Sequence, residues 1–222
     1  APFWVPWNWR GWVRFGTGCI GDWVCHVVDP SFWALDLGAP TSVKAEVFGY
    51  DPKKHVECYP RGTRITFEFP AKGKRPPVKL IWFDGNQRPP RPKELEKNRR
   101  VPGTGAVVYG SKGVIIHGSH GAGGVRIVPE EKMRAYKEPP PKIPRVKGGH
   151  FADWLNAIRE GRKAGSDIAE YGAPLTEIAL LGLIAIRFPK TTLKWDAKNM
   201  RFTNLAEANK YVNPPYRKGW KL

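Results

Sequence analysis

The chain has 222 residues and carries a formal charge of +17 at pH 7, from 37 Lys and Arg against 20 Asp and Glu. Hydrophobic residues make up 41% and charged residues 26%, which is typical of a folded globular chain and excludes a disordered one. The length suffices for one large domain or two small ones. The longest apolar run, at 178–186, is too short to span a bilayer.

The basic excess favours anionic partners, which are nucleic acid, anionic lipid or an acidic polymer. Lys and Arg are spread along the chain, with concentrations at 72–75, 88–100 and 132–147. No recognition-helix signature, zinc-finger spacing or RNA-binding aromatic motif accompanies them. We therefore expect a solvated basic surface and no nucleic-acid partner, and we leave an anionic surface open as a partner.

Three cysteines, Cys19, Cys25 and Cys58, form no CxxC pair, so we predict neither a zinc site nor a disulfide framework, while a single disulfide stays open. The sequence begins abruptly at Ala1-Pro-Phe-Trp4 without a signal peptide, which favours a mature or trimmed form. Ten tryptophans are a high count. We expect most of them to fill the core or line an interface.

The first part of the chain combines an irregular segment with a helical pattern. Residues 1–15 hold four Trp with Pro and Arg, and we expect them to pack over other parts of the fold. A glycine-rich stretch follows and leads into an apolar pattern that predicts a helix within 16–29. Pro30 kinks that helix or starts a second helical piece, which Gly38 ends.

Three polar residues stand out on this helix. Asp22, His26 and Asp29 are spaced at i, i+4 and i+7, which places their side chains on one face. A carboxylate beside an imidazole suits a histidine that moves protons near neutral pH. The alternative from spacing alone is structural, with Asp22 capping the helix and His26 half-buried and hydrogen-bonded.

The middle of the chain changes to period two, which predicts strands. We expect one turn at Asp84-Gly85, after the strand at 78–83, and another at Ser111-Lys112, between the strands at 106–109 and 113–117. Residues 86–102 are basic and Pro-rich and suggest an exposed excursion. Consecutive strands with short turns indicate an antiparallel or mixed sheet with one face covered. The predicted strands are 42–48, 63–69, 78–83, 106–109, 113–117 and 125–128, with one more at 193–195.

The last part of the chain returns to helices. An apolar stripe predicts a helix that Gly161 caps, and it consists of Phe151, Trp154, Leu155 and Ile158. Pro174 has the position of a first-turn proline for a helix reaching Phe188. A short helix and coil end the chain. We therefore predict an α+β fold with an open, mostly antiparallel sheet and helices packed on one face.

Nucleotide-binding signatures are missing from these 222 residues. No strand is followed by GxGxxG and a helix, and no GxxxxGK[ST] occurs. The glycine-rich stretch 118–124 lies between short strands, so we interpret it as a hairpin or flexible loop. His117 and His120 have no evident carboxylate or Cys companion, and we do not expect a metal site.

Several blocks taken together resemble one known family. They include Asn8-Trp-Arg-Gly-Trp12, Gly21-Asp22 with Cys25-His26 and Asp29-Pro30, His150-Phe-Ala-Asp-Trp-Leu155, Pro174-Leu-Thr-Glu177 and Trp195-Asp-Ala-Lys-Asn-Met-Arg-Phe-Thr-Asn204. The chain resembles the C-terminal part of the Gfo/Idh/MocA oxidoreductases, in the branch common among secreted or periplasmic bacterial proteins. The resemblance covers nearly the whole chain.

The resemblance implies a sugar-like or polyol substrate and a nicotinamide cofactor held by an N-terminal Rossmann domain. The family's Asp-x-x-x-His motif matches Asp22 and His26, so His26 would be the acid/base and Asp22 would orient it or contact the substrate. Asp29, Arg10 and Trp12 would bind substrate. The resemblance also implies a periplasmic or secreted location and a homo-oligomer, or a subunit of an assembly, that forms through the open sheet face.

The Rossmann domain and the family's Glu-Lys-Pro lysine are missing from these residues, so NAD or NADP is expected only together with that domain. Leu183 replaces an Asn that related sequences often carry. Three functions are therefore possible. The first is the substrate and oligomerisation domain of an oxidoreductase. The second is a non-catalytic structural or accessory subunit of a protein or membrane-associated assembly, and the third is a redox-neutral glycoside-cleaving relative, which also needs the nicotinamide. We expect one C-terminal-type domain over 1–222, comprising an entry and motif helix (1–40), a sheet (41–130), a Pro/Lys-rich connector (131–149) and a helical tail (150–222).

Overall fold

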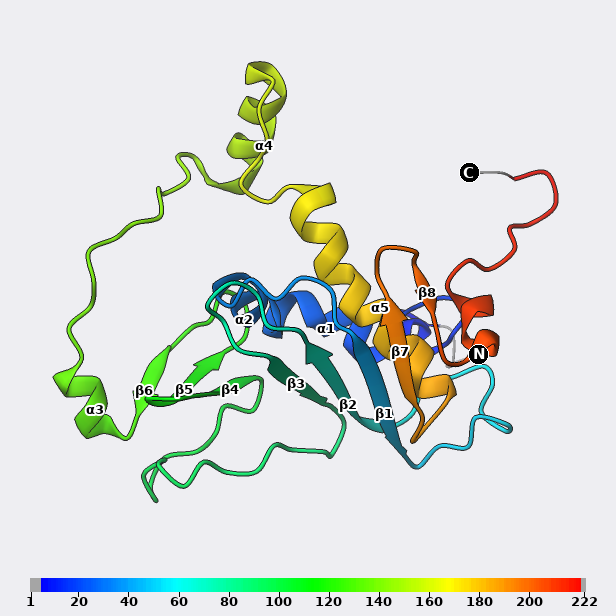
Figure 1. Ribbon diagram of the computed structural model, residues 1–222, viewed down its shortest axis with the longest axis horizontal. Coiled ribbons are helices and arrows are strands. Elements are labelled where there is room, and N and C mark those ends of the chain that lie inside the picture. Colours follow the sequence, from blue (N-terminus) through cyan, green and yellow to red (C-terminus); the bar gives the residue numbers. More distant parts are fainter. Residues whose placement is uncertain (1–4, 221–222) are drawn as a thin grey trace.

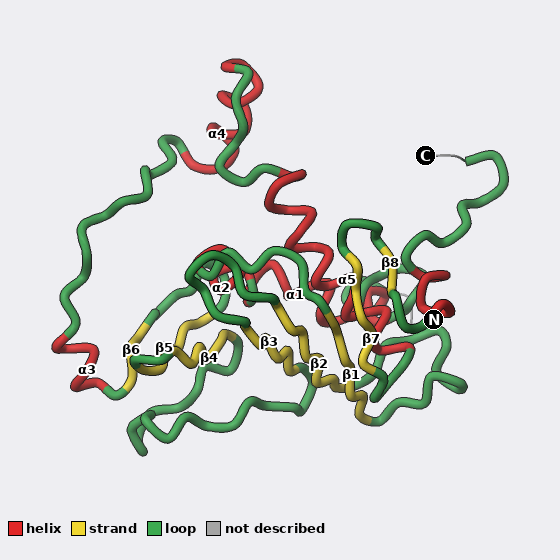
Figure 2. The backbone as a smooth tube through the Cα atoms, in the orientation of Figure 1, coloured by secondary structure: helices red, strands yellow, loops and turns green. Residues whose placement is uncertain are grey.

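The computed structural model describes residues 5–220, so the opening Ala1-Pro-Phe-Trp4 lies outside the described residues. The strands form two antiparallel sheets (Figure 1, Figure 2). The larger has the order β3-β2-β1-β7-β8 and comprises β1 (Ser42–Phe48), β2 (Gly62–Phe69), β3 (Val78–Phe83), β7 (Thr192–Asp196) and β8 (Arg201–Phe202). The smaller has the order β4-β5-β6 and comprises β4 (Gly105–Gly110), β5 (Gly113–Gly118) and β6 (Arg126–Val128).

The mixture of helices and open antiparallel sheets confirms the α+β fold class. The expected division of the chain needs one correction. The strands of 41–130 do not form one sheet, because the long excursion 86–102 separates β3 from β4 and the two strands are not paired. The strand expected at 193–195 within the helical tail is confirmed as β7, which pairs with β1 and extends the larger sheet.

Alternation along β2 explains which face of the larger sheet is covered. Ile65, Phe67 and Phe69 are buried on one face. The other face is polar: Arg64 lies opposite Glu46 on β1 and donates from Nε to its carboxylate at 2.9 Å. Oligomerisation through this face stays a prediction, and the surface offered combines charged side chains with the 42% exposed Ile81 of β3, which lies opposite Thr66.

Two helices cover the apolar face (Figure 1). These are α1 (Gly18–Val27) and α5 (Ala173–Arg187). Gly182 of α5 allows close approach, because a Cβ at this position would lie 2.6 Å from Ile20 of α1 and 3.3 Å from Phe67 of β2. The helix that carries Asp22 and His26 is therefore held by the main core.

A π-helical turn, η2 (Ile168–Gly172), precedes α5, and Pro174 occupies the first turn of α5 as expected. By length and composition alone, the continuous helix Ile168–Arg187 is sufficient to cross a membrane. Its side chains Ile178 and Ala185 are fully buried in the main core. The helix therefore serves as the central core helix of this fold.

The smaller sheet has its own small core, formed by Val114, Ile116 and Val128 with Leu95. Leu95 belongs to the excursion 86–102 and is only 4% exposed, so the expectation that this segment is simply exposed is wrong at that residue. The guanidinium of Arg91 donates to the backbone carbonyl oxygens of Leu95, Glu96 and Arg99. A short helix, α3 (Glu130–Ala135), follows β6.

Helix α4 (Gly149–Glu160) stands away from the rest of the fold (Figure 1, Figure 2). Gly161 ends it in the left-handed conformation, as predicted. Its apolar stripe faces solvent, and among the described tryptophans only Trp82 and Trp195 are buried. Most of the described tryptophans therefore do not fill the core, and their place in an interface stays a prediction. The remaining short elements are α2 (Asp29–Ala34), η1 (Trp9–Gly11) and η3 (Ala206–Tyr211).

Candidate functional site

The carboxylate of Asp22 pairs with Arg10. Arg10 Nη1 lies 2.7 Å from Asp22 Oδ2, and both side chains are about one quarter exposed. The guanidinium also lies 3.9 Å from the centre of the Trp7 ring. Asp22 does not cap α1, because the helix begins at Gly18 with Thr17 as its N-cap residue. In the described part of the chain, no hydrogen bond joins Asp22 to His26.

The ring of His26 instead stacks on a second histidine. The centroids of His26 and His120 are 4.3 Å apart with planes inclined by 24°. Trp23 contacts both rings edge-on, and the backbone N–H of His120 donates to the carbonyl oxygen of His26 at 2.9 Å. The loop after β5 is thereby attached to α1, and it brings a second imidazole to the first.

His120 was not among the expected site residues. It lies in the left-handed region, with φ of 55°, which histidine adopts more readily than most side chains. The N–H of Gly118 donates to the carbonyl oxygen of Gly123 at 2.8 Å and closes the loop. The only sequence signal was a histidine inside a glycine-rich stretch, and nothing in that pattern named α1 as its contact.

The glycines before α1 allow tight packing. A Cβ at Gly16 would lie 2.4 Å from Arg10 Cα. Gly18 has φ of +61°, and a Cβ there would lie 2.9 Å from the ring of Tyr59. The hydroxyl of Tyr59 donates to the carbonyl oxygen of Gly16 at 3.0 Å. The space above this loop is therefore filled by protein, and the loop positions Arg10 next to Asp22.

Trp12 belongs to the same packing layer. It forms an antiparallel bridge with Cys58, and the neighbouring Val13 N–H donates to the carbonyl oxygen of Glu57 at 2.9 Å.

Cys19, Cys25 and Cys58 are free thiols. Between residues 5 and 220, no three His, Cys, Asp or Glu side chains are grouped closely enough to hold a metal ion.

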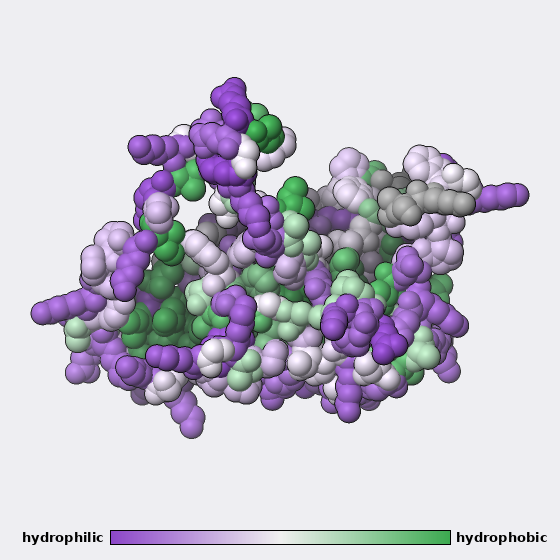
Figure 3. Space-filling view, turned by 45° about the horizontal axis from the view of Figure 1, so that its top comes forward, coloured by the Kyte–Doolittle hydropathy of each residue, from purple (hydrophilic) through white to green (hydrophobic). Residues whose placement is uncertain are grey.

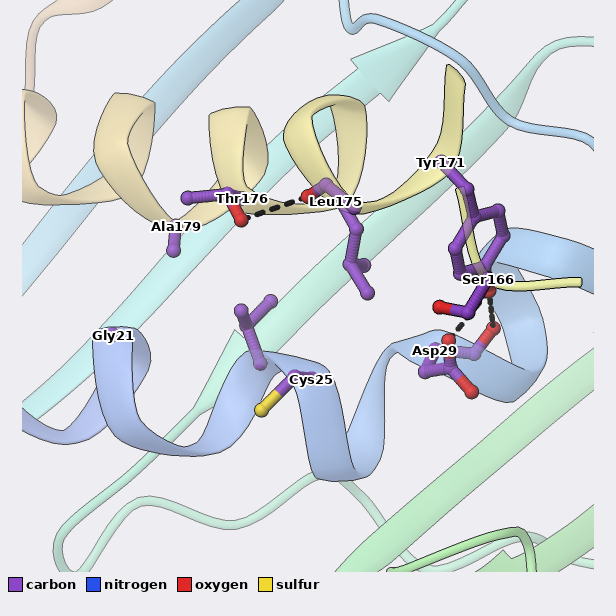
Figure 4. Close-up of a pocket in the computed structure, with 10 residues that line it drawn as sticks. Gly21, Cys25, Asp29, Ser166, Tyr171, Leu175, Thr176 and Ala179 are labelled. Carbon is purple, nitrogen blue, oxygen red and sulfur yellow. Dashed lines mark hydrogen bonds between the residues drawn. The ribbon is translucent and has the colours of Figure 1, made fainter. Parts of the chain in front are cut away.

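Asp29 lies at a separate cavity of about 330 Å³ between α1 and α5 (Figure 4). Tyr171 donates its hydroxyl to Asp29 Oδ1 at 2.5 Å, and burial together with Asp29 raises the pKa of Tyr171 above its ordinary value. The thiol of Cys25 lies on the α1 side (Figure 4). The lining residues are Gly21, Val24, Cys25, Asp29, Ser166, Tyr171, Gly172, Leu175, Thr176 and Ala179.

The predicted site residues therefore fall into separate groups. Arg10, Asp22 and His26 lie with His120 along one side of α1, whereas Asp29 lines the cavity towards α5. The i, i+4, i+7 spacing did not place all three polar residues at one site, because α1 ends at Val27 and Asp29 begins a second helix.

Another buried polar group lies beside the histidine loop. His117 on β5 is 4% exposed, and its Nδ1 lies 2.7 Å from the carbonyl oxygen of Gly118. Its Nε2 is buried without a hydrogen-bond partner.

Comparison with known proteins adds no identification, since neither a protein-family model nor a curated protein matches the chain.

Proposed function

We propose that this chain is the substrate-binding and oligomerisation domain of an NAD(P)-dependent oxidoreductase of sugars or polyols, with His26 as its proton-transfer residue. The observation that carries the proposal is the convergence on α1 of Arg10 from η1, Asp22 and His26 from α1, and His120 from the β5–β6 loop. Polar groups from three distant segments meet on a half-exposed surface, which is how binding sites are commonly built.

The chemistry assigned to each group follows from its surroundings. The His26 imidazole, held by the His120 and Trp23 rings, accepts or donates the proton of a substrate hydroxyl. The Arg10–Asp22 pair offers N–H donors and carboxylate acceptors to neighbouring hydroxyl groups. Asp29 and Trp12 lie in other surroundings, so we leave them out of this assignment.

The residues of this chain do not fit a nicotinamide dinucleotide. The glycine loop that opens α1 is filled by the Arg10 backbone and the Tyr59 ring, and the loop 118–124 leads into a strand rather than a helix. A pyrophosphate is cradled where a glycine loop joins a strand to a helix and leaves room for the phosphates, whereas the first loop follows no strand and is occupied by protein, and the second precedes a strand. We therefore assign to these residues only substrate binding and proton transfer.

The test of binding is an NMR titration of the chain with a panel of sugars, polyols and sugar acids. We expect one member to shift the imidazole signals of both His26 and His120, and His26→Ala to weaken its binding at least about tenfold. His150→Ala on the protruding α4 is the matched control and should leave binding unchanged. A panel without any such shift, or equal binding by His26→Ala, would remove His26 from the site.

Turnover provides the second test. The native gene product should oxidise or reduce the bound compound with NAD(P), and His26→Ala should abolish turnover while the circular dichroism spectrum is retained. Unchanged turnover would exclude His26 as the proton-transfer residue.

A second candidate function is a non-catalytic accessory subunit, and the filled glycine loop favours it. The intact mass of the native gene product and its upstream reading frame discriminate between the two. An in-frame GxGxxG segment after a predicted strand would favour the oxidoreductase. A native chain that starts near Ala1 and works without a partner that binds NAD(P) would favour the accessory subunit.

A further inference from the structure

Helix α4 exposes an apolar stripe that no other described element covers. Its four side chains are between 47% and 70% exposed: Phe151 70%, Trp154 56%, Leu155 47% and Ile158 64%. In Figure 3 hydrophobic and strongly hydrophilic side chains lie next to each other on this protruding part. The apolar surface extends into the flanking segments, where Ile143 is 61%, Val146 51% and Ile168 79% exposed.

Among residues 5–220, the side-chain hydrogen bonds and ion pairs that connect α4 to other segments come from the loop that follows it. The N–H of Gly165 donates to Asp153 Oδ2 at 2.7 Å, and Arg162 pairs with the same carboxylate group at 2.9 Å. The helix has 12 residues, and isolated helices of that length are marginal in water because their stability normally comes from packing of an apolar face. A surface that covers the stripe would therefore stabilise α4.

The charge around the stripe indicates what that surface is. The segment 142–165 contains six Lys or Arg but only two acidic residues. Both acidic residues, Asp153 and Glu160, are paired with Arg162, so the segment keeps an excess of positive charge. The other basic side chains, Lys142, Arg145, Lys147, Arg159 and Lys163, are exposed, and Lys163 among them pairs with Glu170. This positive excess, on a chain with a net charge of +17, attracts an anionic surface.

We propose that α4 and the basic segment 136–148 form a peripheral membrane anchor for surfaces rich in anionic phospholipid. Phe, Trp, Leu and Ile on one helix face, with flanking Lys and Arg, are the composition of helices that lie in the interface plane. The apolar stripe enters the boundary between headgroups and acyl chains, and the basic side chains contact lipid phosphates. The core of the protein stays in water, with its proton-transfer surface independent of the anchor.

The experiment is cosedimentation of the full chain with vesicles of phosphatidylcholine alone and of phosphatidylcholine mixed with phosphatidylglycerol. We expect binding to the mixed vesicles only, and weaker binding when salt rises from about 0.1 M to about 1 M, because the Debye length shortens. Trp154→Ser combined with Phe151→Ser should lower the partition coefficient about tenfold or more. The near-ultraviolet circular dichroism spectrum of this double variant should keep the signals of the unmodified chain, apart from those of the two replaced aromatic residues, which would show that the core is still folded.

Matched controls separate the contribution of the apolar stripe from that of the basic side chains. Trp33 is 59% exposed on α2, so Trp33→Ser removes a similar aromatic surface elsewhere and should bind like the unmodified chain. Lys142→Gln with Lys147→Gln should weaken binding at low salt, whereas Lys93→Gln with Lys97→Gln should have a smaller effect.

Three results would overturn the anchor. The first is no binding to phosphatidylglycerol vesicles. The second is equal binding by the Phe151 and Trp154 variant, which would leave only general charge attraction. The third is a dimer in sedimentation velocity that the same two substitutions convert to a monomer, which would assign the stripe to a second copy.

Discussion

The imidazole rings of His26 and His120 stack at 4.3 Å, although one lies on α1 and the other in the loop between β5 and β6. The backbone hydrogen bond from His120 to the carbonyl oxygen of His26 accompanies the stack. This contact joins the smaller sheet to the helix of the larger core. It makes His120 a positioning residue for His26.

His120→Ala should weaken that connection. We expect the free energy of unfolding to fall by about 0.5–1.5 kcal/mol, the usual contribution of an aromatic pair, and the His26 ring signals in NMR spectra to broaden or move. Urea unfolding and the two-dimensional imidazole spectrum check this. His55→Ala, whose ring contacts Asp51 and Tyr50 rather than His26, should leave the His26 signals in place. Unchanged His26 signals in His120→Ala would show that the stack does not position His26.

Gly16→Ala should disturb the Arg10–Asp22 ion pair although it replaces neither of the two charged side chains. The added Cβ would lie 2.4 Å from Arg10 Cα, so the backbone must move, and overpacking of this kind costs about 1–3 kcal/mol. Urea unfolding measures the loss. Gly11→Ala is the matched control, because a Cβ at Gly11 meets no atom within 4 Å. Equal stability of the two variants would contradict the packing assigned to Gly16.

Tyr171→Phe removes the donor of the hydrogen bond to Asp29. We expect a loss of about 1–2 kcal/mol in the free energy of unfolding, because the remaining carboxylate is partly buried without its partner. Asp29→Asn combined with Tyr171→Phe should lose less than the sum of the two single changes, which a double-mutant cycle in urea measures. Tyr109→Phe, on the exposed end of β4, should be neutral. Simple additivity would show that the two side chains do not interact.

Asp84 should make stability depend on pH. Burial raises the pKa of its carboxyl group, against the opposing hydrogen bonds from Trp82 and Thr63. Between the ordinary carboxyl value, about 4, and the raised value, the folded chain binds more protons than the unfolded chain. The contribution of Asp84 is therefore present at low pH and lost as pH rises through the raised pKa.

Asp84→Asn removes this titration, so the difference in unfolding free energy between the unmodified chain and the variant should shrink or reverse as pH rises. Urea unfolding from about pH 3 to about pH 7 measures that difference. A difference that grows with pH would contradict a raised pKa at Asp84.

Local patterns in the sequence were sufficient for most elements. The alternation at 42–48 and the apolar segment 78–83 before the Asp84-Gly85 turn predicted β1 and β3 with the bounds observed, because these are local patterns of the chain. Gly161 and Pro174 likewise marked a helix end and a helix start. The partition into two sheets was not predictable in this way, because strand pairing depends on which distant segments meet.

The candidate site and helix α4 likewise combine features that local sequence determines with features that only contacts between distant segments determine. The sequence by itself determined that Asp22 and His26 share a helix, since helical spacing is a local property. Only the tertiary structure decided that Asp22 pairs with Arg10, that His26 stacks on His120, and that Asp29 turns towards Tyr171. It also decided that the stripe on α4 faces solvent. Periodicity predicts that an apolar face exists, but what covers that face depends on contacts between segments far apart in the chain.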